Sequence, residues 1–371
     1  MSQSARIALD ATVVRPPLSG VHYAVRDQVL ALLAGPQSHA WLALATDPAI
    51  VAAATTAGQP APALSASLRR VSVRVAWQQS RLPGLLADAQ CGALAALAYT
   101  APLRCSVPTV LQVHDLIALR RPELCSRLNA LHMRALMPAS IRRATRILAT
   151  SQTVADDILA LFPDCRERLH VARLAVADRF LSPPAAPLPE AVAGLERYLL
   201  FVGVLEPKKG VDTLLDAYAQ VADRTPDVTL VLAGRVGWRC AELVARLEGW
   251  RGPGRVLRLG YVEEATLPAL YARAAAVVMP SRDEGFGLPV LEAMACGAPV
   301  VHSDQRALLE TAGGAGVPVP VGDAPALAAA LTRLLASPDL QADRAAAGRA
   351  HARARTYHDW ATDFRTVVDG L

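Results

Sequence analysis

Two adjacent lysines and two spaced glutamates are the residues of this sequence whose types and spacing could do chemistry. Lys208 and Lys209 are the only lysines among 38 basic residues, and they stand side by side before a glycine. An ammonium is a compact charge suited to phosphate, whereas a guanidinium is a broad fork. The pair therefore predicts a phosphate contact, with two chance surface lysines as the alternative.

Glu284 and Glu292 belong to a segment that follows an apolar strand-like run and opens a helical one. Gly285 and Gly287 lie between them and allow the backbone to approach a ligand closely. The N–H groups near Gly287 and Leu288 form an anion site at the start of the helix. Glu292, about one turn further along, has a reach suited to ribose hydroxyls, and Glu284 in the loop can accept hydrogen bonds from a sugar. The segment predicts a nucleotide-sugar site.

Short apolar runs that alternate with helical patterns must position these side chains. Such alternation predicts parallel sheets covered by helices on both faces. The expected strands are 7–9, 71–75, 109–113, 146–149, 198–202, 228–233, 256–259, 276–279 and 299–301, and the expected helices are 23–33, 123–143, 152–161, 211–221, 264–274, 288–296 and 345–371.

A proline-rich stretch at 181–189 divides the pattern into two halves. Four prolines in nine residues cannot continue a helix or a sheet, so the stretch predicts an interdomain linker. The expected domains are residues 1–182 and 183–371, and the last helix is free to pack back on the first domain. Two domains also fit a length of 371 residues.

Composition favours a folded protein of a reducing compartment. Apolar residues make up 53% of the chain, and the net charge of +5 is mild, without the basic runs of a nucleic-acid binder. Six cysteines show neither C-x-x-C nor zinc-ligand spacing. The start of the chain does not resemble a signal peptide, and the apolar segment 85–98 is too short to span a bilayer. These features predict a cytoplasmic protein.

One small basic group, Arg142, Arg143 and Arg146, departs from the even charge distribution. A solvated helix face is the ordinary interpretation of such a group. Contact with an anionic acceptor or a membrane surface is the alternative, and it leaves peripheral membrane contact open.

The segment 281–300 resembles the E-x7-E signature of retaining GT-B glycosyltransferases, the large family usually numbered four. The signature pair here is Glu284 and Glu292, with Gly285, Phe286, Gly287 and Leu288 in the donor-binding loop between them. The family places the donor sugar and nucleotide against this loop.

Residues 201–215 resemble the first βα turn of the family's C-terminal domain, which begins after Gly203. A basic pair there holds the donor diphosphate. Lys209 matches the family's lysine, and Lys208 stands where arginine is common. Val204 occupies a position where many members have arginine, so the resemblance assigns more of the charge to Lys208.

Further matches are spread along the chain. Gly20 resembles the glycine of the loop after the first strand, which approaches the donor, and His114 resembles a strand-end histidine that reaches the donor sugar. A histidine satisfied within the core is the alternative for His114. Val262 lies in a stretch similar to the loop whose backbone contacts the base.

The resemblance implies a GT-B fold, in which two Rossmann-like domains face a central cleft. The implied reaction moves a hexosyl group from a GDP- or UDP-sugar to a glycan, lipid-linked or small-molecule acceptor with retained configuration. Glu284 and His114 would be the catalytic residues, and no cofactor or metal is expected, since no D-x-D triplet occurs. A noncatalytic nucleotide-sugar-binding module and a GT-B epimerase or phosphorylase are the alternatives. The sugar, the base and the acceptor stay open.

Overall fold

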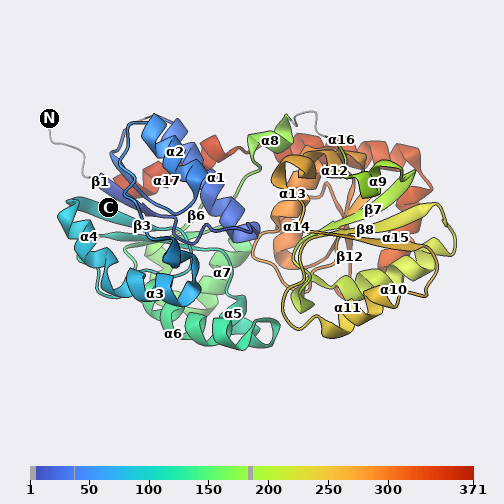
Figure 1. Ribbon diagram of the computed structural model, residues 1–371, viewed down its shortest axis with the longest axis horizontal. Helices are drawn as coiled ribbons and strands as arrows, with labels where there is room; N and C mark the ends of the chain where they lie inside the picture. Colours follow the sequence, from blue (N-terminus) through green and yellow to red (C-terminus); the bar gives the residue numbers. More distant parts are fainter. Residues whose placement is uncertain (1–5, 37, 183–186) are drawn as a thin grey trace. The chain divides into compact units, whose positions relative to one another are not determined.

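The computed structural model describes residues 6–36, 38–182 and 187–371. Within these residues the chain forms two compact units. The first comprises residues up to Leu174 together with Tyr357–Leu371, and the second comprises Ala175–Thr356. Each unit is built on one six-stranded sheet with helices on both faces (Figure 1).

The first sheet consists of strands that pair in parallel in the order β2-β1-β3-β4-β5-β6. Because helices cover both faces, the strands are mainly apolar rather than alternating between apolar and polar residues. The strands are β1 (Arg6–Asp10), β2 (Trp41–Leu44), β3 (Cys91–Ala96), β4 (Thr109–Val113), β5 (Arg146–Ala149) and β6 (Leu169–Val171). The helices are α1 (Gly20–Ala34), α2 (Pro48–Thr56), α3 (Val71–Ser80), α4 (Leu82–Asp88), α5 (Ile117–Arg120), α6 (Arg127–Arg143), α7 (Gln152–Leu161) and α17 (Tyr357–Asp369).

The second sheet is also parallel, in the order β12-β11-β10-β7-β8-β9. Figure 1 shows α10 and α11 on one side of this sheet and α12 and α16 on the other. The strands are β7 (Arg197–Val202), β8 (Val228–Ala233), β9 (Arg255–Gly260), β10 (Ala276–Met279), β11 (Val300–Ser303) and β12 (Val317–Val319). The helices are α8 (Asp178–Leu181), α9 (Glu190–Ala193), α10 (Val211–Ala222), α11 (Ala241–Glu248), α12 (Leu267–Arg273), α13 (Leu288–Ala295), α14 (Arg306–Ala312), α15 (Ala324–Leu335) and α16 (Pro338–Arg353).

The strand expected at 71–75 is wrong, because Val71–Ser80 is helix α3. The alternation of Val71, Val73 and Val75 imitates a strand, but Arg74 and Gln78, four residues apart, share the buried face of a helix. The strands that complete the sheet are β2, β3 and β6, which the sequence reading did not assign.

The division between the units falls a few residues before the expected boundary of 182 and 183. The proline-rich stretch drew attention to residues after Ser182, of which 183–186 lie outside the described residues. The preceding segment already packs in the second unit, where the Phe180 ring lies 6.0 Å from Tyr271 and Arg179 pairs with Glu264 at 2.5 Å.

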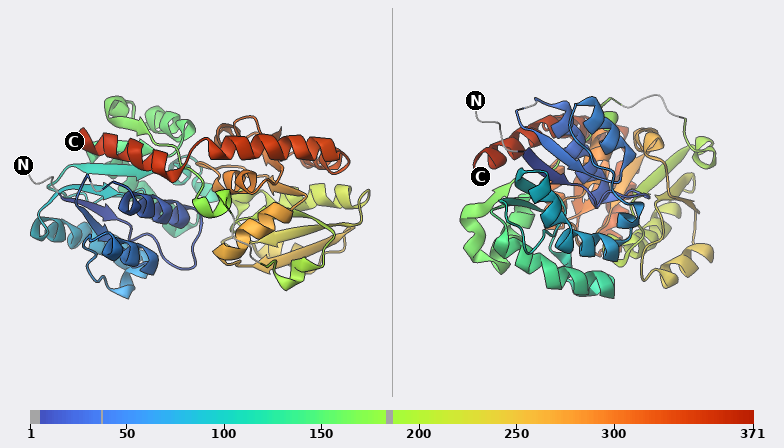
Figure 2. Two further views of the ribbon diagram at one scale, coloured as in Figure 1. Left: turned by 90° about the horizontal axis from the view of Figure 1, so that it is seen from above. Right: turned by 60° about the vertical axis from the view of Figure 1, so that its left-hand side comes forward.

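The helical tail expected at 345–371 is two helices, which separate around Thr356. α16 belongs to the second unit, where it packs on α13. α17 belongs to the first unit and packs on α1 (Figure 2). There, Trp360 and Phe364 are fully buried, so the end of the chain completes the first core.

Candidate functional site

The order of the second sheet creates a site at the carboxyl ends of β7 and β10. These strands are neighbours, but the chain leaves β7 toward β8 on one side and β10 toward β11 on the other. Open α/β sheets bind ligands in the crevice at such a point. The two loops meet there, since Arg282 donates from its backbone N–H to the Lys208 carbonyl at 2.7 Å and from its side chain to the Pro207 carbonyl at 2.7 Å.

The two lysines lie in a single 3-10 turn, Pro207–Lys209, between β7 and α10. Gly210 follows in the left-handed conformation, with φ of 65°. A Cβ at Gly210 would lie 2.1 Å from the Pro280 carbonyl oxygen, so only glycine allows the turn to pack this closely against the second loop. The sequence thus brings both lysines to the end of β10.

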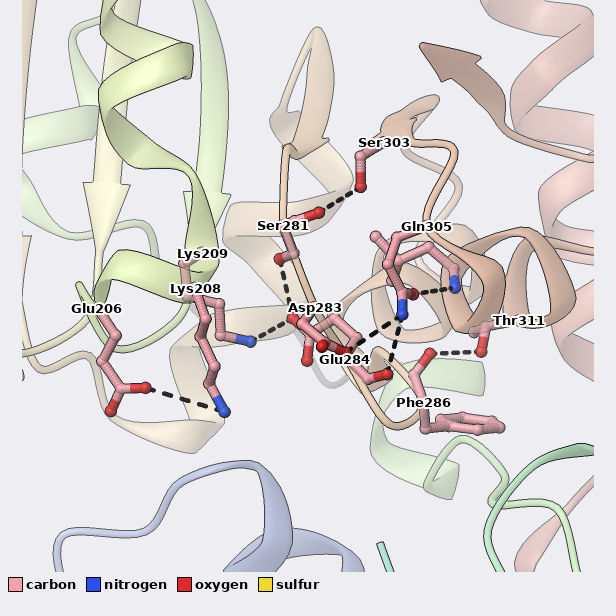
Figure 3. Close-up of polar contacts among 11 residues, drawn as sticks. Glu206, Lys208, Lys209, Ser281, Asp283, Glu284, Phe286, Ser303, Gln305 and Thr311 are labelled. Carbon is pink, nitrogen blue, oxygen red and sulfur yellow. Dashed lines mark hydrogen bonds and ion pairs between the residues drawn. The ribbon is translucent and has the colours of Figure 1, made fainter. Parts of the chain in front are cut away.

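Lys209 and Glu284, which the sequence reading assigned to different parts of one ligand, form an ion pair. The Lys209 Nζ and Glu284 Oε1 atoms are 2.5 Å apart, with 14% and 9% of the two side chains exposed. Ser281 donates its hydroxyl to the same carboxylate oxygen at 2.9 Å. Figure 3 shows the Lys209 ammonium turned toward Glu284, while Lys208 extends toward Glu206, 3.9 Å away.

The environment of Glu284 keeps its carboxyl ionised. Burial raises the pKa of Glu284, but the charges of Lys209 and Lys208 and the hydrogen bonds from Lys209 and Ser281 outweigh it, so the pKa lies below its ordinary value. Oε2 accepts no hydrogen bond from the described residues. The carboxylate can therefore still accept a hydrogen bond from a ligand.

Three polar side chains outside the loop hold its backbone (Figure 3). Ser303 donates to the Ser281 carbonyl at 2.6 Å, Gln305 to the Glu284 carbonyl at 3.2 Å, and Thr311 to the Phe286 carbonyl at 2.5 Å. Sequence reasoning did not identify Gln305 and Thr311. The one feature of the sequence that could have identified these two residues is their position after β11, the strand next to β10 in the sheet.

Helix α13 begins directly after the loop. Gly287 precedes it with φ of 96°, and a Cβ there would lie 2.4 Å from Leu308 Cδ2, so glycine is required. The N-cap residue, Gly287, has no side chain that could cap this end of the helix. Its first N–H groups therefore remain suited to an anionic ligand beside Lys209.

Glu292, to which the sequence assigned a reach suited to ribose hydroxyls, is largely enclosed by protein. Its side chain lies within α13, the residue is 8% exposed, and Tyr271 of α12 donates its hydroxyl to Oε2 at 2.8 Å. Burial, together with the Glu292 charge, raises the pKa of the nearby Cys296 to about 12. Tyr271 is a partner of Glu292 that sequence reasoning missed.

The loops after β7, β8 and β9 also meet at this edge. A Cβ at Gly234 would lie 1.9 Å from the Gly203 carbonyl oxygen, and Gly234 donates to the Gly260 carbonyl at 2.7 Å. Gly203 thus lies beside the lysine turn, and Val262 follows Gly260, half-buried. The structure gathers the second-unit donor-binding candidates at one sheet edge.

His114 lies in the first unit, directly after β4. It is 5% exposed, and its Nε2 lies 2.9 Å from the Leu97 carbonyl oxygen. The same Nε2 atom lies 3.1 Å from Gln112 Nε2. Because the shorter contact is to a carbonyl, which only accepts, we assign the hydrogen to Nε2, and this assignment leaves Nδ1 as the acceptor. Burial lowers the pKa of His114, so the ring is neutral at pH 7. Nε2 is thus bound within the protein, so a contact between His114 and a sugar donor would have to be made by Nδ1.

Gly20 begins α1 and is exposed, and a Cβ there would meet nothing within 4 Å. Close approach within the protein therefore does not require glycine at this position. The basic group spans the end of α6, with Arg142 and Arg143, and the start of β5, with Arg146. It has local partners: the Arg142 guanidinium lies 5.2 Å from the Phe162 ring centre, and Arg146 donates to the Gly370 carbonyl at 2.8 Å. This agrees with a solvated helix face.

Residues 6–36, 38–182 and 187–371 contain no group of three or more His, Cys, Asp or Glu side chains placed to hold a metal ion. Within the same residues, no helix is both long and apolar enough to cross a membrane.

Residues 196–337, which carry the lysine turn and the glutamate loop, match the family described as glycosyl transferases group 1. O-antigen chain mannosyltransferase B of Escherichia coli is 32% identical over 254 residues, which cover 67% of each chain. The serotype-specific mannosyltransferase WbdA of Escherichia coli is 28% identical over 207 residues, which cover 52% of this chain and only 25% of that longer protein.

The fold has relatives of known structure. The crystal structure of Anabaena HepE in complex with UDP and glucose superposes with a TM-score of 0.73, covering 99% of this chain and 100% of HepE at 21% identity. The two parallel six-stranded sheets with their helices match such GT-B structures, which confirms the predicted fold class. The chain belongs to the glycosyl transferases group 1 family. It is a glycosyltransferase.

Proposed function

We propose that this glycosyltransferase moves a hexosyl group from a nucleotide diphosphate sugar to an acceptor with retained configuration. The observation that carries the proposal is the pairing of Lys209 with Glu284 at the sheet edge where α13 begins. A lysine ammonium, a carboxylate with one open oxygen and a helix N-terminus thus lie together. Retention rests on the resemblance of Glu284 and Glu292 to the E-x7-E signature.

In the proposed complex, Lys208, Lys209 and the start of α13 bind the donor diphosphate and stabilise the charge that grows as the glycosidic bond breaks. Lys209 has three N–H donors, so it can keep one bond to Glu284 while it binds phosphate. The leaving diphosphate takes the proton of the attacking acceptor hydroxyl. No metal or cofactor is proposed, because the lysine turn supplies positive charge and the sequence has no D-x-D triplet.

The other predicted residues contact the rest of the donor. Glu284 Oε2 binds sugar hydroxyls, while Glu292, oriented by Tyr271, binds the ribose. The backbone near Val262 contacts the base. We propose that His114 acts through Nδ1, since its Nε2 is bound to Leu97.

The relatives suggest the substrate classes. Mannosyltransferases of O-antigen synthesis support a mannose donor, and the HepE complex supports a nucleoside diphosphate. We propose a GDP- or UDP-hexose as donor and a glycan or lipid-linked acceptor of polysaccharide biosynthesis.

We further propose a cytoplasmic protein that touches a membrane through α6. Leu128 and Leu131, one turn apart on this helix, are 83% and 70% exposed, and the exposed Arg127 and Arg134 flank them. Apolar side chains with basic neighbours suit an anionic bilayer surface. Replacing both leucines by serine should abolish sedimentation with phosphatidylglycerol vesicles, and unchanged sedimentation would contradict membrane contact.

Labelled donors test the proposed reaction. The purified protein is incubated with radiolabelled GDP- and UDP-hexoses and a mixture of glycan and lipid-linked acceptors, and the anomeric configuration of any product is determined by NMR. Label transferred with retained configuration supports the proposal. Donor binding without transfer would favour a nucleotide-sugar-binding module, and conversion of the free donor sugar would favour an epimerase.

A further inference from the structure

The guanidinium of Arg74 in the first unit is a buried charge without a partner. Arg74 lies on α3 and is 7% exposed. It makes no hydrogen bond or salt bridge with the described residues, and its Nε is buried without an acceptor. A charge removed from water normally requires a counterion or several hydrogen bonds. Arg74 has neither within the part of the chain that the structure describes.

The nearest acid does not fill this role. Asp10, the last residue of β1, acts on Arg74 through space. However, Thr12 donates to Asp10 Oδ1 at 2.6 Å from its hydroxyl, and Gln78 donates to Oδ2 at 2.9 Å. Gln78 is itself held by the Thr100 carbonyl at 3.0 Å. Asp10 is thus committed to a buried network that joins β1, α3 and the loop after β3.

Two further basic side chains act on Arg74 or are acted on by it through their charges. The positive charge of Arg15 opposes that of Arg74 and, after burial, contributes to lowering the pKa of Arg74. His132 of α6 has a pKa lowered by burial and by Arg74, and its Nε2 is buried without a hydrogen-bond partner among the described residues. Arg15 itself donates to the Arg69 carbonyl at 2.8 Å. Among the described residues, Arg74 and His132 thus each keep a buried nitrogen atom without a hydrogen-bond partner, and the positive charge acting here exceeds the charge of Asp10.

The location favours a ligand. The chain passes from β1 to β2 on one side and then crosses to β3, which pairs with β1 on the other side. Asp10 ends β1, and Thr100 follows β3, so the Arg74 cluster lies at the point where the strand order of the first sheet reverses. Parallel sheets bind ligands at this point.

We propose that Arg74, with Arg15 and His132 beside it, forms a phosphate-binding site in the first unit, and that the phosphate belongs to the acceptor substrate. The assignment to the acceptor rests on the proposed function, in which the donor diphosphate occupies the lysine turn of the second unit. A guanidinium that is buried and free of internal partners can bind two phosphate oxygens at once. The phosphate would neutralise the cluster and orient the acceptor.

Calorimetry and thermal melting with inorganic phosphate test the site in the full-length protein, without donor and in a buffer poor in other anions. The variants are Arg74→Met, which keeps the bulk and removes the charge, and Arg74→Lys, which keeps the charge. Arg81→Met is the matched control, because Arg81 follows the same helix, is exposed and caps no group with its side chain.

Phosphate should bind the wild type and raise its melting temperature. Arg74→Met should weaken phosphate binding at least about tenfold, the order of one charge-assisted contact. Arg74→Lys should weaken phosphate binding less, and Arg81→Met should leave it unchanged. Without phosphate, Arg74→Met should melt no lower than the wild type, since an unpaired buried charge has been removed. Equal phosphate responses in all variants would mean an adventitious ion only and would overturn the site.

Four further ligands identify the source of the phosphate. Loss of mannose 6-phosphate binding in Arg74→Met would indicate a soluble acceptor, and loss of phosphatidylglycerol vesicle binding would indicate a lipid-borne one. GDP and UDP should bind Arg74→Met as they bind the wild type. If their binding were lost, the phosphate would belong to the donor and the acceptor assignment would be wrong. None of these measurements requires transfer activity, so they can fail independently of the proposed reaction.

Discussion

At the scale of single residues, the side chains predicted to bind the sugar donor already contact other side chains of the protein. Lys209 binds Glu284 at 2.5 Å, and Tyr271 binds Glu292 at 2.8 Å. The sequence could identify the lysines and glutamates because their chemical types and spacing are visible. It could not show Tyr271, because that contact depends on how α12 packs on α13.

The two glutamates should affect different kinetic constants. Glu292 is assigned to the ribose, which is bound equally before and during the reaction, so Glu292→Gln should mainly raise the donor KM. Glu284 is assigned to the sugar ring, whose charge changes in the transition state. Glu284→Gln should lower kcat by roughly two orders of magnitude, or about 2.7 kcal/mol.

Steady-state kinetics of the two variants and of Tyr271→Phe check this division. Tyr271→Phe removes only the hydrogen bond to Glu292, so it should follow Glu292→Gln in direction with a smaller effect. Since both glutamates are largely buried, melting temperatures should confirm that each variant is folded. A normal kcat in folded Glu284→Gln would remove Glu284 from the catalytic residues.

The lowered pKa of Glu284 predicts a pH-dependent contribution to stability. The folded-state pKa lies below the value of about 4.3 expected for the unfolded chain, because the lysines favour the charged form. The contribution is therefore complete above about pH 4.3 and is lost as the pH falls through the folded-state pKa.

The difference in melting temperature between wild type and Glu284→Gln measures this contribution. The wild type should melt higher at about pH 6, and the difference should shrink toward about pH 3. Ser337→Ala, which alters a helix cap far along the chain from the site, should show a difference that depends much less on pH. A constant difference for Glu284→Gln would contradict the ion pair.

At the scale of elements, local sequence patterns predicted the strands that support the site. β4, β5, β8 and β10 lie where the apolar runs predicted them. α3 was wrongly predicted as a strand, because its three alternating valines form a strand-like pattern. The helical spacing of its buried polar residues was not recognised. The supports from Gln305 and Thr311 could not be predicted, since they depend on how the segment after β11 packs against the glutamate loop.

Thr311 allows a test of this support. It is 3% exposed, and Thr311→Val removes the hydroxyl that binds the Phe286 carbonyl. An unsatisfied buried carbonyl costs about 1–3 kcal/mol, so the variant should melt lower and bind the donor several-fold more weakly. Thr213→Val in α10 is the control, because Thr213 is equally enclosed but makes no hydrogen bond with the described residues through its side chain. Equal effects of the two substitutions would show that the loop does not depend on Thr311.

At the scale of the whole molecule, the two units repeat one arrangement, a parallel sheet whose strand order reverses near its centre. The sequence predicted this fold from the alternation of strands and helices and from the family resemblance. The end of the chain was harder to place. The 16-residue helix α16 belongs to the second unit, but the next helix, α17, packs on α1 in the first unit. Such long-range packing leaves no local signal.

Transfer should not depend on a divalent metal. The lysine turn provides the positive charge that a bridging metal would otherwise supply, so activity should persist in excess EDTA. Initial rates measured with EDTA and with added Mg²⁺ or Mn²⁺ check this expectation. Complete loss of activity in EDTA that either ion restores would contradict it.

The proposed function depends most on diphosphate binding by the lysine turn, and the affinity for nucleoside diphosphates tests this most directly. Isothermal titration with GDP and UDP should show binding of at least one of them by the wild type. Lys208→Ala and Lys209→Ala should each weaken that binding, and Lys209→Ala by at least about tenfold, because a charge-assisted phosphate contact contributes about 1.5–3 kcal/mol. Arg246→Ala on α11, which removes a surface charge paired with Asp216, should bind like the wild type. If the folded double variant Lys208→Ala/Lys209→Ala bound the nucleotide with wild-type affinity, the donor site would lie elsewhere.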